Sequence, residues 1–189
     1  AHHHTVMSTF ACGGGSSMGY KLAGYDVVAA NDIDPQMARI YQENHHPKQF
    51  FLCPVKDLLT RDDLPTVDVL DGSPPCSTFS LAGSREKAWG VEKKFREGQA
   101  KQELDKLFFD FLDVAEKMRP KVVIAENVEG IIRGKAVKYV NAIVARFKKM
   151  GYNIDIFLCD GTNMGLPQMR RRVFFVANRL GKHLKLSFN

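Results

Sequence analysis

The 189-residue chain alternates short apolar segments with segments of helical periodicity, and this alternation restricts its fold more than any other feature. The apolar segments have the length and the β-branched content of buried strands. Strands that alternate with helices form a mainly parallel sheet that carries helices on both faces. We therefore expect an α/β fold with a seven-stranded, mainly parallel sheet. The expected strands are residues 5–10, 26–30, 50–53, 67–71, 121–125, 153–159 and 173–177.

Helical segments are expected between these strands. Serines that follow a glycine-rich turn can cap a short first helix, which ends near Gly24. Pro35 stands where the second helix begins, because the N–H that proline lacks has no partner in a first helical turn. This helix is expected to end near Asn44. Apolar stripes at helical spacing predict two further helices over 104–118 and 137–147.

Composition excludes several classes of protein. With 44% hydrophobic and 25% charged residues, the chain has the make-up of an ordinary globular protein. No apolar stretch approaches the ~20 residues that a membrane-spanning helix needs, and no signal peptide is visible. The formal net charge of +6 is compatible with a polyanionic partner such as nucleic acid. We therefore expect a cytoplasmic protein without a membrane partner.

The cysteines are too widely scattered for a disulfide framework or a zinc site, which favours reduced thiols and predicts no metal. Of the four, Cys12, Cys53 and Cys159 are interpreted as structural. Residues 1–4 contain three histidines and are interpreted as the remainder of an affinity tag. The charged stretch 84–101 has no apolar period and is expected to be a mobile loop.

A glycine-rich turn, FACGGGSSMG, follows the first expected strand. Glycines let a backbone turn sharply and approach a ligand closely. Asp32 follows ~20 residues later at the end of the second strand, where a carboxylate can bind the hydroxyls of a ribose. The pair predicts a cofactor that contains adenosine. Both a nicotinamide dinucleotide and S-adenosylmethionine fit this pattern.

Three further motifs are placed at strand ends, where α/β folds bind their ligands. In SPPCS, two prolines restrict the backbone directly before Cys76, as a nucleophilic thiol held at a fixed angle requires. Glu126 of ENV closes the strand 121–125, and by itself it could equally form a surface salt bridge. The arginines of QMRRR (168–172) precede the last strand and, taken alone, indicate a solvated or phosphate-binding patch.

The order FxxGGG, NDID, SPPCS, ENV and QxRxR resembles the DNA (cytosine-5) methyltransferases over residues 5–178. This resemblance implies a catalytic domain with the Rossmann-like fold of class I methyltransferases. It also implies S-adenosyl-L-methionine as cofactor and double-stranded DNA, with the target base flipped out, as substrate. A restriction-modification role in a bacterial or phage-like setting would follow.

The resemblance also assigns catalytic roles. Cys76 matches the nucleophile that adds to C6 of cytosine, and Glu126 matches the acid that engages N3 and the exocyclic amine. Arg172 matches the residue that binds the base oxygen O2, and Arg170 supports the site. In this scheme the acid and the cations stabilise the charge that develops on the ring as the thiolate adds.

Cofactor positions follow from the same resemblance, with two departures. Asp32 matches the ribose carboxylate, and Ile33 matches the apolar residue beside the adenine. Cys12 stands where family members usually have glycine. Val55 aligns where they usually offer an acidic residue to the adenine amine, although Asp57 is close by. The other positions carried over are Phe10, Gly13, Gly15, Pro75 and Leu107.

Family members continue past the last strand into a target-recognition domain and a final helix, so residues 179–189 match the start of a further region. We therefore expect either a shortened form or one part of an enzyme whose target recognition lies on a second polypeptide. Three alternatives remain open. They are a tRNA cytosine-5 methyltransferase of the same family, a binding module whose catalysis has decayed, and a nicotinamide-dependent dehydrogenase.

Overall fold

The computed structural model describes residues 3–75, 92–93, 102–103 and 106–185. Cys76 and most of the stretch predicted as a mobile loop lie outside these residues. In that stretch lies β5 (Glu92–Lys93), which pairs antiparallel with β6 (Gln102–Glu103) directly after the stretch.

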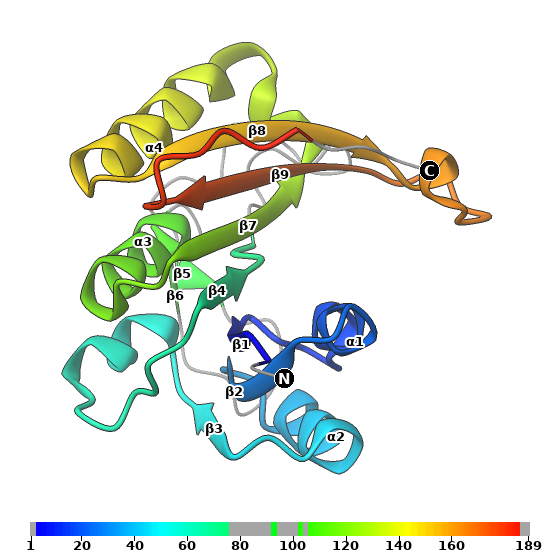
Figure 1. The fold of residues 1–189 in the computed structure, drawn as a ribbon, viewed down its shortest axis with the longest axis vertical. Coiled ribbons are helices and arrows are strands. Elements are labelled where there is room, and N and C mark those ends of the chain that lie inside the picture. Colours follow the sequence, from blue (N-terminus) through cyan, green and yellow to red (C-terminus); the bar gives the residue numbers. More distant parts are fainter. Residues whose placement is uncertain (1–2, 76–91, 94–101, 104–105, 186–189) are drawn as a thin grey trace.

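A seven-stranded sheet forms the centre of the molecule, in the order β3-β2-β1-β4-β7-β9-β8 (Figure 1). Neighbouring strands of this sheet pair in parallel, except that β9 runs antiparallel to both β7 and β8. The predicted mainly parallel seven-stranded sheet is therefore confirmed. Its strands are β1 (Thr5–Thr9), β2 (Asp26–Asp32), β3 (Gln49–Leu52), β4 (Val69–Gly72), β7 (Val122–Val128), β8 (Asn153–Asp160) and β9 (Arg171–Asn178).

Helices lie on both faces of this sheet, as predicted. Figure 1 shows α1 and α2 on one side and α3 and α4 on the other. The helices are α1 (Gly15–Leu22), α2 (Pro35–His45), α3 (Leu107–Met118) and α4 (Val137–Lys149). Short 3-10 helices are η1 (Val55–Thr60), η2 (Glu129–Ile132), η3 (Gly134–Ala136) and η4 (Gly161–Met164).

The main core lies between the sheet and the apolar stripe of α3. Phe108 and Phe111 of this helix are buried, and the Phe108 ring packs edge-on against Phe175 of β9 at 5.4 Å between centroids. Burying such a side chain stabilises the fold by about 1.5–3 kcal/mol. Arg119, in the left-handed conformation, caps the C-terminus of α3 just before Pro120.

Several element boundaries differ from the predictions. Glu126 lies within β7 rather than after it, and Arg171 and Arg172 lie within β9 rather than before it. The cross-strand pairs Glu126↔Phe174 and Val128↔Arg172 continue the ladder through these polar positions. Backbone pairing, which apolar patterning does not report, therefore extends both strands towards the site.

The start of α1 also differs. Gly14, with a φ of 93°, occupies the N-cap position and no side chain caps the helix. Ser16, one of the serines predicted to cap, instead donates a hydrogen bond to the carboxylate of Asp71 on β4. The preceding strand ends at Thr9 because Phe10 has a φ of 51°.

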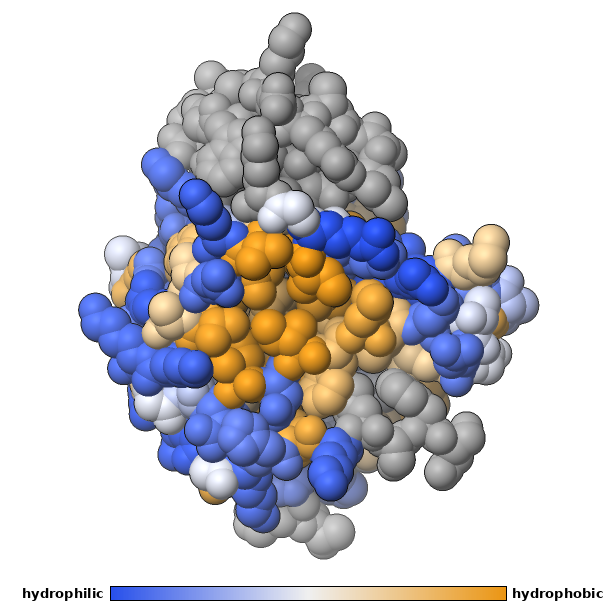
Figure 2. All heavy atoms as spheres, turned by 90° about the horizontal axis from the view of Figure 1, so that it is seen from above, coloured by the Kyte–Doolittle hydropathy of each residue, from blue (hydrophilic) through white to orange (hydrophobic). Residues whose placement is uncertain are grey.

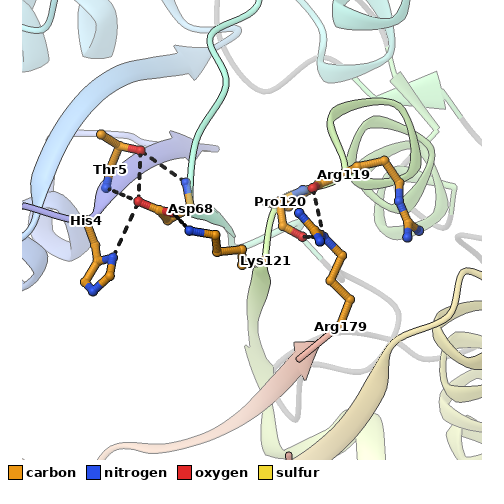
Figure 3. A network of polar contacts seen from close by, with 7 residues as sticks. All are labelled: His4, Thr5, Asp68, Arg119, Pro120, Lys121 and Arg179. Carbon is orange, nitrogen blue, oxygen red and sulfur yellow. Dashed lines mark hydrogen bonds and ion pairs between the residues drawn. The ribbon is translucent and has the colours of Figure 1, made fainter. Parts of the chain in front are cut away.

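Asp68, just before β4, is the centre of a polar network near the amino ends of the central strands (Figure 3). Its carboxylate accepts hydrogen bonds from the backbone N–H of Thr5 at 3.0 Å and from Lys121 Nζ at 2.7 Å. The bond from Lys121, followed by that from Thr5, lowers the pKa of Asp68 to about 2. His4 Nδ1 lies 3.5 Å from the same carboxylate, so this histidine of the predicted tag remainder contacts the domain.

An apolar area is exposed at the end of the molecule where α4 and β8 lie (Figure 2). The exposed hydrophobic side chains on these two elements include Val137, Ile156 and Leu158. Because β8 is the last strand of the sheet, Ile156 and Leu158 lie on its edge strand. Among the described residues, no helix combines the length and apolarity that crossing a membrane requires.

Gly72, the last residue of β4, provides a test of this packing. A Cβ at this position would lie 2.5 Å from Cε2 of Phe111 and 2.7 Å from Oγ1 of Thr9. We expect Gly72→Ala to lower the free energy of unfolding by about 1–3 kcal/mol, because a buried ring must shift. Urea denaturation followed by circular dichroism measures this loss.

The matched control is Gly19→Ala in α1, where an added Cβ meets no atom within 4 Å. This exchange is expected to stabilise the chain by about 0.5–1 kcal/mol, because alanine restricts the unfolded chain and favours a helix. Equal midpoints for the two variants would contradict the packing described for Gly72.

Candidate functional site

The glycine-rich turn follows β1 at the carboxyl edge of the sheet, and its backbone is unusual. Phe10 and Cys12 have φ angles of 51° and 47°, a conformation that non-glycine residues rarely adopt. Cys12 stands where the resemblance leads us to expect glycine, which would adopt this angle without the ~1–2 kcal/mol of strain. Cys12 is exposed, and its interpretation as a structural residue stays a prediction.

Asp32 ends β2 directly beside this turn. Its Oδ2 accepts a hydrogen bond from the backbone N–H of Cys12 at 2.8 Å, and its Oδ1 accepts one from that of Asp34 at 2.9 Å. The carboxylate is therefore held in one orientation, and each oxygen can accept a second hydrogen bond. These two acceptor oxygens fit the ribose hydroxyls of an adenosine cofactor, which can donate to them.

His45 supports the turn from below, a role that the sequence did not suggest. A Cβ on Gly14 would lie 2.1 Å from His45 Nε2, so only glycine leaves room for this imidazole. The ring packs on Tyr41 at 4.7 Å between centroids. Burial, followed by the charge of Lys21, lowers the pKa of His45. His45 and Gly14 are far apart in the sequence, and no motif there predicts that they meet.

The other predicted cofactor positions differ in exposure. Gly13, Gly15 and Pro75 are exposed, and Ile33 is half-buried. Two further positions, Val55 and Leu107, are only 3% and 2% exposed and belong to the main core cluster, on which Phe10 packs. Contact of these residues with a cofactor stays a prediction.

Glu126 and Arg172 meet on neighbouring strands at the same edge. Arg172 Nε lies 2.9 Å from Glu126 Oε1, and both side chains are about one-quarter exposed. Burial raises the pKa of Glu126 above its ordinary value, although Arg172 and then Arg170 act in the opposite direction. The carboxyl group therefore holds a proton more readily than a surface glutamate does.

The three consecutive arginines have different partners. Arg171 Nε lies 3.1 Å from Asp160 Oδ2, and its Nη1 lies 3.5 Å from Glu129 Oε1. Successive side chains of a strand point to opposite faces, which separates Arg171 from the cluster of Glu126 and Arg172. Arg170 is exposed and acts on Glu126 through its charge.

Asn127 connects this cluster to the segment that leads to Cys76. Its Nδ2 donates a hydrogen bond to the backbone oxygen of Pro74 at 3.2 Å, and the residue is only 4% exposed. Asn127 thereby ties the end of β7 to the double proline. The ENV motif contained this residue, but no role for it followed from the sequence. Cys76 itself lies two positions beyond Pro74, outside the described residues.

The remaining thiols and candidate metal ligands form no second site here. Burial raises the pKa of both Cys53 and Cys159, which disfavours their reactive thiolate form and agrees with their structural interpretation. The described ranges contain no group of three or more His, Cys, Asp and Glu side chains arranged to hold a metal ion.

Comparisons with known proteins converge on one family. The family model described as C-5 cytosine-specific DNA methylase matches residues 4–188. The Type II methyltransferase M.FnuDI of Fusobacterium nucleatum is 31% identical over 182 residues, and M.NgoPII of Neisseria gonorrhoeae is 27% identical over 183. These alignments cover 96% and 97% of this chain but 48% and 50% of the relatives. The chain thus spans about half the length of the curated relatives it matches.

The fold is similar to that of a solved DNA modification methyltransferase encoded within an E. coli prophage. The TM-score is 0.74 at 24% identity, and the match covers 97% of this chain and 49% of the other. The likeness supports the Rossmann-like arrangement of the sheet and helices.

Proposed function

Because the chain belongs to the C-5 cytosine-specific DNA methylase family, whose members use S-adenosyl-L-methionine, we propose that it carries the catalytic part of a DNA (cytosine-5) methyltransferase. The observation that carries this proposal is the 2.9 Å contact between Arg172 Nε and Glu126 Oε1, beside the Asn127–Pro74 hydrogen bond. An acid, a cation and the segment before a predicted nucleophile thereby meet at one edge of the sheet.

In the proposed reaction, the thiolate of Cys76 adds to C6 of a flipped-out cytosine and forms a covalent bond. A protonated Glu126 donates a hydrogen bond at N3, and Arg172 donates one to O2, so the charge that enters the ring is stabilised. The bound cofactor supplies the methyl group that C5 takes up. A base then removes the C5 proton, and the Cys76 thiolate leaves.

Asp32 is proposed to accept hydrogen bonds from the cofactor ribose, and the Gly13–Gly15 turn would contact the same cofactor. The fixed carboxylate of Asp32, 2.8 Å from the Cys12 amide, supports this arrangement. The Type II names of the relatives further support a restriction-modification role for the whole protein. Since the chain spans about half of those relatives, we place target recognition on residues outside these 189 or on a second polypeptide.

A direct test compares the isolated chain with the chain supplied with the C-terminal half of a relative such as M.FnuDI. The chain alone is expected to bind S-adenosylhomocysteine in calorimetry but not NAD, and to methylate DNA poorly. Base flipping costs a few kcal/mol, which a full set of DNA contacts must offset. The supplemented form is expected to transfer labelled methyl groups to duplex DNA.

Each alternative predicts a different outcome. Preferential labelling of tRNA would identify an RNA methyltransferase of the same family, and binding of NAD would favour a dehydrogenase. Cofactor binding without transfer by the supplemented form would favour a binding module. Efficient sequence-specific methylation by the isolated 189 residues would contradict the proposal that target recognition lies outside them.

A further inference from the structure

Asp71 is a buried carboxyl group that the proposed reaction does not use. It lies on β4, one residue before Gly72, and is 8% exposed. Three hydroxyl groups donate hydrogen bonds to it. Ser16 Oγ and Ser8 Oγ lie 2.8 and 3.1 Å from Oδ2, and Tyr20 Oη lies 3.1 Å from Oδ1.

No ion pair balances this carboxylate within the part of the chain that the structure describes. The neighbouring titratable groups that act on it or respond to it are Tyr20 of α1, Tyr41 of α2 and Glu126 of β7, and none of these is a cation. Burial is the main reason that the pKa of Asp71 rises to about 6, while the three hydroxyls oppose this rise. At neutral pH the described part of the chain therefore holds a buried anion that none of its own cations balances.

The position of Asp71 relates this anion to the cofactor. Ser16 lies in the first turn of α1, directly after Gly15 of the glycine-rich turn, and is itself exposed. On its other side, Asp71 is followed by Gly72 and then by the segment of Pro74 and Pro75. The carboxylate thus lies beneath both segments that are predicted to contact the cofactor.

We propose that Asp71 is a specificity-determining residue whose negative charge, held below the glycine-rich turn by Ser16, favours the cationic S-adenosylmethionine over the neutral S-adenosylhomocysteine. The two ligands differ by the methyl group and the positive charge of the sulfonium, so an anion nearby discriminates between them. This inference rests on the proposed function. The charge of Asp71 would also help the enzyme to release S-adenosylhomocysteine, because its attraction for the sulfonium is lost once the methyl group has been transferred.

The test measures both dissociation constants by calorimetry on the 189-residue chain and its Asp71→Asn variant. Asparagine keeps the shape and can still hydrogen-bond to the three hydroxyls, but it carries no charge. At pH 7.5 we expect the preference for S-adenosylmethionine to fall about fivefold in the variant, because one attraction between opposite charges is lost. The unsubstituted chain should lose the same preference as the pH is lowered to 5, and the variant should not.

The matched control is Asp26→Asn, which removes one negative charge at the exposed amino end of β2. It should leave the ratio of the two dissociation constants unchanged. Ser16→Ala removes the hydroxyl that contacts Asp71 at the exposed end and should lower the preference for S-adenosylmethionine in the same direction as Asp71→Asn.

Thermal stability gives a second measurement, in which Asp71→Asn should raise the melting temperature although it weakens the binding of S-adenosylmethionine. The folded pKa of Asp71 lies above its unfolded value of 3.8, so the contribution of this group to stability is fully present below that value and is lost as the pH rises through about 6. At pH 7.5 the Asp71→Asn variant escapes this loss and should melt at a higher temperature while it binds S-adenosylmethionine more weakly. A residue retained only for structure would not separate the two effects.

Two outcomes would overturn the inference. If Asp71→Asn weakens both ligands by the same factor, Asp71 supports the fold and does not discriminate by charge. If the unsubstituted chain binds neither ligand at millimolar concentration, the proposed function itself fails, and the inference fails with it.

Discussion

Replacing Cys76 with serine is expected to abolish methyl transfer by the supplemented enzyme while leaving cofactor binding intact. A hydroxyl is far less nucleophilic than a thiolate at neutral pH, so addition to C6 should nearly stop. Loss of a covalent nucleophile lowers turnover by about a thousandfold or more. The cofactor contacts predicted at Asp32 and the glycine-rich turn do not involve this thiol. Methyl transfer and calorimetry with S-adenosylhomocysteine measure the two effects separately.

A trapping experiment tests the same assignment without kinetics. A duplex that contains 5-fluorocytosine should form a covalent adduct with the enzyme, because fluorine at C5 cannot leave as a proton does. The adduct should map to Cys76 and be absent from the Cys76→Ser variant. Cys53→Ser is the matched control, because this half-buried thiol has a raised pKa and no proposed role. A Cys76→Ser enzyme that retains a substantial fraction of turnover would exclude the nucleophile.

Glu126→Gln is expected to lower turnover by a factor of about 100–1,000, in line with the loss of a catalytic acid. Glutamine keeps the shape of the side chain but cannot hold or deliver a carboxyl proton. It also removes the negative partner of the half-buried Arg172, whose Nε lies 2.9 Å from Glu126 Oε1. Single-turnover methylation of duplex DNA measures the change.

The pH profile distinguishes this role from a structural one. Burial raises the pKa of Glu126, and the reactive form is the protonated one, so the rate should fall as the pH rises through that raised pKa. This limb of the profile should be missing from Glu126→Gln. Arg171→Lys, on the opposite face of β9 and paired with Asp160, is the matched control and should retain the limb. A profile that Glu126→Gln leaves unchanged would mean that the acid lies elsewhere.

Much of the fold could be predicted from local pattern alone. The alternation of apolar and amphipathic segments led to the mainly parallel seven-stranded sheet, and Pro35 marked the start of α2, which Asp34 caps through the N–H groups of Gln36 and Met37. These features depend on residues that are close in sequence, so they leave a signal there. Boundaries at the site were wrong where polar residues continued a strand. Glu126 and Arg172 lie inside β7 and β9 because cross-strand pairing extends the ladder.

The sequence by itself determined the family, because motif order and residue type need no coordinates, and it predicted the class of chemistry and the residues that would carry it. Only the tertiary structure decided which side chains meet. It paired Arg172 with Glu126 and Arg171 with Asp160, although the two arginines are adjacent in sequence. It also brought His45 beneath Gly14, Asn127 to Pro74, and three hydroxyls around Asp71. The physical reason is that these contacts join residues far apart in the chain, and only the packing of strands and helices fixes their distances and their charges.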